Sequence, residues 1–94
     1  MAKAYVGDML IAESDETVIV EGNHYFPPDS VKLDLFTENA RQTTCPWKGV
    51  ASYYDIQVDG TVLPAAAWYY PQPSERAAQI KDHIAFYPVV TIES

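Results

Sequence analysis

Short runs of β-prone residues, separated by prolines and turn-forming pairs, are the feature that most constrains the fold of this 94-residue chain. The aromatic run His24–Phe26 meets Pro27 and Pro28, which remove two amide donors and fix φ, so no strand ladder continues through them. Further on, Asp59 and Gly60 can supply the positive φ angles of a tight hairpin turn. A chain of this length fits a single domain, residues 1–94. We therefore expect a compact, mainly β fold of about six to eight short antiparallel strands.

The expected strands are runs rich in β-branched and aromatic residues. They lie at residues 9–11, 17–20, 24–26, 31–35, 51–58, 61–70 and 89–92. We expect the first two to form a hairpin through the turn residues 14–16, and a second turn at residues 21–23. The strand at 51–58 is the clearest, because its residues alternate between two faces, with Tyr54 on one and Tyr53 on the other. For residues 31–35 a short helical turn is the alternative.

One helix is expected near the C-terminus, after the break made by two prolines. Ser74 can cap a helix that starts at Glu75 and runs to about residue 86, so that the segment covers residues 74–86. On a helical wheel Ala77, Ile80 and Ile84 form its apolar stripe.

The segment between the expected strands at 31–35 and 51–58 carries the only cysteine. Residues 37–49 are polar and irregular, and we expect them to form the longest loop. Gly49 permits a tight reversal that brings Lys48 back toward the thiol of Cys45. Since a neighbouring ammonium stabilises a thiolate and His24 is a candidate base, these three are candidate catalytic residues. The alternative is that Cys45 is a small buried hydrophobe and Lys48 a packed or solvated cation.

Aromatic residues cluster on the expected strands. Neighbouring strand residues point to opposite faces, so each cluster places one ring in the core and another outside it. Tyr53, Trp68 and Tyr70 are therefore candidate walls of a ligand pocket. Ordinary sheet packing is the alternative, because aromatic residues favour strands.

Three polar residues complete the candidate ligand-binding set: Glu21, Asn23 and Asp55. Glu21 can act as a ligand anchor or as a general acid or base. Asn23 can also hydrogen-bond its own backbone at a turn, and Asp55 can also belong to a solvated strand face.

Charge and cysteine count exclude several classes of partner. Six basic against thirteen acidic residues give a net charge of −7, which repels phosphate backbones and anionic membranes. One cysteine excludes an internal disulfide, and the two histidines give no metal-ligand spacing, so we expect no metal and no cofactor. The first residues lack the apolar run of a signal peptide, and no stretch is apolar enough to span a membrane. We expect a cytoplasmic protein.

Five sequence blocks occur in an order that resembles a known family. They are Val20-Glu21-Gly22-Asn23-His24-Tyr25-Phe26-Pro27, Thr44-Cys45-Pro46-Trp47-Lys48-Gly49, Ala51-Ser52-Tyr53-Tyr54, Ala66-Ala67-Trp68-Tyr69-Tyr70-Pro71 and Ile84-Ala85-Phe86-Tyr87. Together they resemble the family catalogued as domain of unknown function 427, also labelled nucleotidyltransferase-like, over nearly the whole chain. The resemblance implies a β-tent fold, the group that includes B-type methionine sulfoxide reductases. Many relatives in that group hold a structural zinc with paired cysteine motifs; with Cys45 alone, no structural zinc is expected here.

The sequence leaves four functions open. The first is a domain that binds a small molecule in an aromatic pocket beside the Cys45–Lys48 loop. The second is an enzyme that uses Cys45 as an activated thiol. The third is nucleotidyl transfer, which the family label suggests, although Asp34, Asp55 and Asp59 lie apart in the sequence. The fourth is an interaction module whose exposed aromatic residues form a homodimer face.

Overall fold

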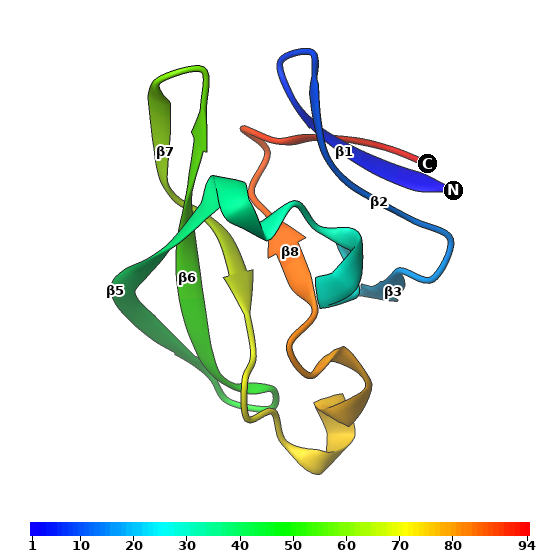
Figure 1. Cartoon of the computed structure of the whole chain (residues 1–94). Coiled ribbons are helices and arrows are strands. Elements are labelled where there is room, and N and C mark those ends of the chain that lie inside the picture. Colours follow the sequence, from blue (N-terminus) through cyan, green and yellow to red (C-terminus); the bar gives the residue numbers. More distant parts are fainter.

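Three antiparallel β-sheets make up the computed structural model, which describes all residues 1–94 (Figure 1). The largest sheet has four strands in the order β5 (Phe36–Cys45), β6 (Gly49–Val58), β7 (Thr61–Tyr69) and β8 (Ile84–Phe86). A three-stranded sheet has the order β2 (Met9–Ser14), β1 (Ala2–Val6) and β9 (Thr91–Glu93), and therefore brings the two chain ends side by side (Figure 1). The third sheet is the hairpin of β3 (Val18–Val20) and β4 (Asn23–Tyr25). The expected mainly β, antiparallel fold is confirmed.

The helical segments are short. They are the 3₁₀ helices η1 (Pro28–Ser30), η2 (Leu33–Leu35) and η3 (Glu75–Ile80). No helix in the structure is both long enough and apolar enough to cross a membrane.

The large sheet contributes to an apolar cluster on each of its two faces. Along β6, Ile56 and Val58 belong to a cluster that the sheet shares with β1 and β2. Ala51 and Tyr53 point the other way, into a second cluster that includes Tyr25 of β4 and two residues of η3. This alternation confirms the two faces predicted for the strand at 51–58.

The β6–β7 hairpin forms as predicted. Asp59 and Gly60 have φ angles of 51° and 78°, as a two-residue hairpin turn requires. The strand continues beyond Pro64 to Tyr69, also as predicted. A proline is tolerated there because β7 is irregular at this point: Leu63 and Ala67 pair with Ile56 and Tyr54, which places three residues of β7 opposite one of β6.

The hairpin predicted between residues 9–11 and 17–20 is wrong. β2 pairs with β1 instead, and β3 pairs with β4. The turn at Glu21 and Gly22 that joins β3 to β4 is the turn predicted at residues 21–23. Of the strand predicted at residues 31–35, only Val31 pairs, in an isolated antiparallel bridge to Ala12, and Leu33–Leu35 form η2, the helical turn that was the alternative.

The long loop predicted at residues 37–49 is also wrong. Residues Phe36–Cys45 form β5, which hydrogen-bonds to β6 as the edge strand of the large sheet. Most of its side chains are exposed, so the strand lacks the apolar alternation by which a sequence pattern reveals a half-buried strand.

The predicted helix over 74–86 is replaced by η3 and β8. Ala77 and Ile80 are buried as expected, but Asp82 has a φ of 60° and the chain turns there. Ile84 then faces the first apolar cluster and Ala85 the second, so β8 is buried on both faces. A strand buried on both faces shows no alternation of apolar and polar residues. The sequence of β8 therefore fits the helical pattern of the residues before it as well as it fits a strand.

Candidate functional site

The turn between β5 and β6 buries a lysine. The Lys48 side chain is 8% exposed, and its ammonium forms an ion pair with the Glu21 carboxylate, which is 52% exposed on the β3–β4 turn. The ammonium also lies 5.2 Å from the ring centre of Trp47 and 5.8 Å from that of Tyr70. Burial is the largest single influence on the pKa of Lys48 and lowers it, but the hydrogen bond to Glu21 and the interactions with Tyr25, Tyr70 and Cys45 together outweigh burial, so the pKa is raised. The lysine is therefore a fixed cation rather than a base.

Two buried tyrosines surround this ion pair. Burial raises the pKa of Tyr70 to about 12 and also raises the pKa of Tyr25, so both phenols are neutral. The hydroxyl of Tyr25 accepts a hydrogen bond of 3.1 Å from the indole N–H of Trp68. Tyr25 was not among the predicted site residues.

Close backbone packing holds the Lys48 turn against the segment before η3. The amide of Ser74 donates to the Lys48 carbonyl at 2.9 Å, and the Ser74 hydroxyl donates to the Trp47 carbonyl at 2.6 Å. Ser74 therefore ties two segments together and makes no side-chain helix cap. Gly49 has a φ of 118°, and a Cβ there would lie 3.2 Å from the carbonyl oxygen of Gln72, so the turn requires glycine.

The structure thus gathers part of the predicted site in one place. Glu21, Lys48 and Tyr70 meet at the ion pair, and Cys45 is partly buried against the same apolar cluster. His24 is not brought to Cys45. Its Nδ1 hydrogen-bonds the Thr17 hydroxyl at 3.0 Å, on the face of β4 opposite Tyr25.

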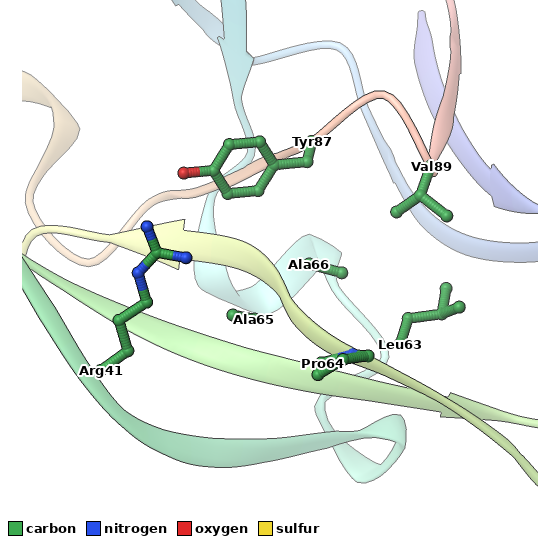
Figure 2. Close-up of a pocket in the computed structure, with 7 residues that line it drawn as sticks. All are labelled: Arg41, Leu63, Pro64, Ala65, Ala66, Tyr87 and Val89. Carbon is green, nitrogen blue, oxygen red and sulfur yellow. The ribbon is translucent and has the colours of Figure 1, made fainter.

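A cavity of about 350 Å³ lies elsewhere, between β7 and the segment after β8 (Figure 2). Five of its seven lining residues are apolar, and the lining is Arg41, Leu63, Pro64, Ala65, Ala66, Tyr87 and Val89. Figure 2 shows the Arg41 guanidinium reaching toward the Tyr87 ring at one end, with Leu63 and Val89 at the other. The cavity is therefore apolar with one polar end.

The wall at the polar end is a stack of aromatic rings. The rings of Tyr53 and Tyr87 are nearly parallel, 6.4 Å apart, and the guanidinium of Arg41 lies 4.9 Å from the centre of the Tyr53 ring. The Tyr53 hydroxyl is 2.8 Å from that of Thr43 and 3.4 Å from that of Tyr87. The hydrogen bond with Tyr53 raises the pKa of Tyr87, which therefore keeps its proton. Trp68 packs against the outer ring, 4.7 Å from Tyr87.

The Asp55 carboxylate holds two segments of the chain beside the cavity in place. Asp55 accepts hydrogen bonds from the Asn39 amide at 2.7 Å and from the backbone N–H of Ala65 at 2.8 Å. Ala65 has a φ of 50°, and Asn39 in turn accepts the backbone N–H of Arg41 at 2.8 Å. Asp55 thereby fixes the irregular parts of both β5 and β7. These two hydrogen bonds lower the pKa of Asp55.

We expect Asp55→Asn to lower the melting temperature at neutral pH, with an effect that fades in acid. The pKa of Asp55 is depressed in the folded state, so the stability it adds is complete above its unfolded value of about 3.9 and is lost as the pH falls through the folded value. Thermal melts of both proteins at pH values from neutral to acid measure the gap between them. Asp34→Asn, at an exposed aspartate, is the control. A gap that is constant with pH, or equal in the control, would contradict this role.

Three predicted site residues thus support the cavity without lining it. Tyr53, Asp55 and Trp68 each contact a lining residue, whereas Arg41 and Tyr87 were not predicted as site residues. Arg41 belongs to the segment 37–49, from which only Cys45 and Lys48 were predicted as site residues. A second, polar hollow of about 290 Å³ is lined by Tyr5, Gly7, Asp8, Thr91 and Glu93. No three His, Cys, Asp or Glu side chains group as metal ligands.

The fold and site define a small, mainly β domain with an apolar cavity at the irregular part of its main sheet. Comparison with known families matches residues 1–93 to the family described as "Domain of unknown function (DUF427)". The chain belongs to this family, as the sequence blocks predicted. The family's short label refers to NTP transfer, but it names no residue of this chain. No curated protein matches the sequence.

Proposed function

We propose that this domain binds a small molecule in the cavity between Arg41 and Val89. The observation that carries the proposal is the cavity of about 350 Å³, because ligand pockets are hollows of about 300–1,000 Å³ with mostly apolar walls and a few converging polar groups. The guanidinium of Arg41 and the hydroxyl of Tyr87 are such groups.

The cavity supports this proposal better than the Lys48 turn does. The Lys48 ammonium already has a carboxylate partner and is covered by the rings of Trp47 and Tyr70. Arg41 takes part in none of the three ion pairs of the structure, so its charge is free to meet a ligand. The sequence analysis expected the ligand pocket beside the Cys45–Lys48 loop. We propose instead that the ligand binds in the cavity lined by Arg41, Tyr87 and Val89, which lies beside another part of the same sheet.

Filling the cavity is expected to abolish ligand binding. Val89 lines the cavity and is 55% exposed, so Val89→Trp can place an indole over it without disturbing the core. A thermal-shift screen of small metabolites on the wild-type protein identifies stabilising compounds, since a ligand that prefers the folded state raises its melting temperature. We expect Val89→Trp to lose that stabilisation.

The matched control is Val62→Trp. Val62 is also an exposed valine, 52% exposed on β7, but it does not line the cavity, and this variant should keep the response. Stabilisation that survives in Val89→Trp, or that both variants lose equally, would place the ligand elsewhere.

We also propose the β-tent as the finer description of the fold, on the family resemblance, and a cytoplasmic location, on the sequence. The β-tent is compatible with the three antiparallel sheets.

A further inference from the structure

We propose that the ligand of the Arg41–Val89 cavity is a small monocarboxylate with an apolar body. This inference rests on the proposed function, since it names the class of ligand for the same cavity. It follows from the charge, the geometry and the shape of the lining residues.

The first argument is charge. Arg41 is the only charged residue that lines the cavity, and it has no acidic partner although the chain carries thirteen acidic residues. The net charge of −7 repels anions, so an anionic ligand is attracted only where a basic side chain lies next to its binding site. One guanidinium balances one negative charge, which favours a monoanion over a phosphate with two charges.

The second argument is geometry. The Tyr53 ring lies 4.9 Å from the guanidinium carbon and faces one side of Arg41. The guanidinium N–H donors of Arg41 make no ion pair within the protein, and its only side-chain contact with a ring is this one, so the donors are available to a ligand. A carboxylate matches the edge of a guanidinium with two parallel hydrogen bonds. The backbone of Arg41 is held by Asn39, so the side chain starts from a fixed point.

The third argument concerns the remainder of the cavity. Tyr87 is neutral and can donate one hydrogen bond at the polar end. The other lining residues are Leu63, Pro64, Ala65, Ala66 and Val89, which offer apolar contact only. A ligand that fits both ends therefore has one carboxylate and a short aliphatic or aromatic body.

Matched pairs of acid and amide test this class directly. The probes are phenylacetate and phenylacetamide, cinnamate and cinnamamide, and isovalerate and isovaleramide, titrated at neutral pH and followed by the amide NMR signals of the cavity residues. Each pair has one body and differs in its charge. We expect each acid to bind about tenfold or more tightly than its amide, because hydrogen bonds to charged groups contribute about 1.5–3 kcal/mol.

Arginine variants assign that preference to a residue. Arg41→Gln should remove the preference for the acid, and Arg41→Lys should retain only part of it, because lysine lacks the two-pronged donor geometry. The matched control is Arg76→Gln. Arg76 also lies over an aromatic ring, 5.5 Å from the centre of Trp47, but does not line the cavity, so this variant should bind like the wild type.

The outcomes separate this inference from the function on which it rests. Equal affinity for acids and amides, or an acid preference that survives Arg41→Gln, overturns the carboxylate class while the cavity stands as a binding site. If no probe binds and the metabolite screen yields a neutral or cationic compound blocked by Val89→Trp, the class is again overturned. If no stabilising metabolite depends on Val89, the proposed function fails and the inference fails with it.

Discussion

Replacing Lys48 by alanine is expected to lower the free energy of unfolding by about 3 kcal/mol, because a long buried side chain leaves a cavity when it is truncated. The Lys48 side chain, 8% exposed, lies between the turn that joins β5 to β6 and the Glu21 carboxylate on the β3–β4 hairpin. The substitution also removes the charge that faces the rings of Trp47 and Tyr70. Glu21 loses its partner, but as a half-exposed carboxylate it can be solvated.

Lys48→Met separates packing from charge. Methionine keeps an apolar stem of similar length, so we expect a loss of only about 1 kcal/mol. Lys32→Ala is the control, because Lys32 is exposed and takes part in no ion pair; a surface substitution of this kind changes stability by about 0.5 kcal/mol or less. Urea unfolding at neutral pH measures all three. Equal losses for Lys48→Ala and Lys32→Ala would show that the ion pair and its packing contribute nothing.

Replacing Phe26 by alanine is expected to have the larger effect, a loss of about 4 kcal/mol, typical of a buried phenylalanine truncated to alanine. Phe26 is fully buried, and its ring packs edge to face against Phe86, with ring centres 5.6 Å apart. Its backbone exchanges two hydrogen bonds of 2.8 Å with Ile84. Phe26 therefore joins the β3–β4 hairpin to β8 and to the apolar cluster between the two larger sheets.

A loss of about 4 kcal/mol is a large share of the total free energy of unfolding of a domain of this length. At roughly 0.05–0.15 kcal/mol per residue, its total stability is about 5–14 kcal/mol. Phe26→Leu keeps most of the volume and should cost about 1.5 kcal/mol or less. Urea unfolding of both variants beside the wild type tests the role. A loss for Phe26→Ala no greater than that for Phe26→Leu would mean that the ring does not join the two parts.

The strands that could be predicted from sequence are those with a strong local signal. Residues 51–58 alternate between two different environments, and Asp59-Gly60 is a turn of specific backbone geometry. The segments that could not be predicted lack such a signal. β5 is exposed along most of its length, and β8 is buried on both faces, so neither shows the alternation of a half-buried strand.

The candidate site was predictable only in part, for the same physical reason. The sequence blocks drew attention to Lys48 and to the aromatic strands, and the structure brings Glu21 and Tyr70 to that lysine. Arg41 and Tyr87 lie 46 residues apart in the numbering, and both line the cavity only because the strand order places β5 and β8 in the same sheet as β7. No local pattern encodes such a meeting, which depends on strand order in the sheet.

The irregular part of β5 has a consequence for the behaviour of many copies of this chain in concentrated solution. A long, straight edge strand presents an unbroken row of amide and carbonyl groups on which another molecule can anneal and so start an aggregate. In β5 the pairing with β6 is interrupted between Asn39 and Gln42, where two extra residues distort the edge. Intermolecular annealing is thereby confined to two short stretches. The same distortion that places Arg41 at the cavity therefore also disfavours edge-to-edge association of β5 with other molecules.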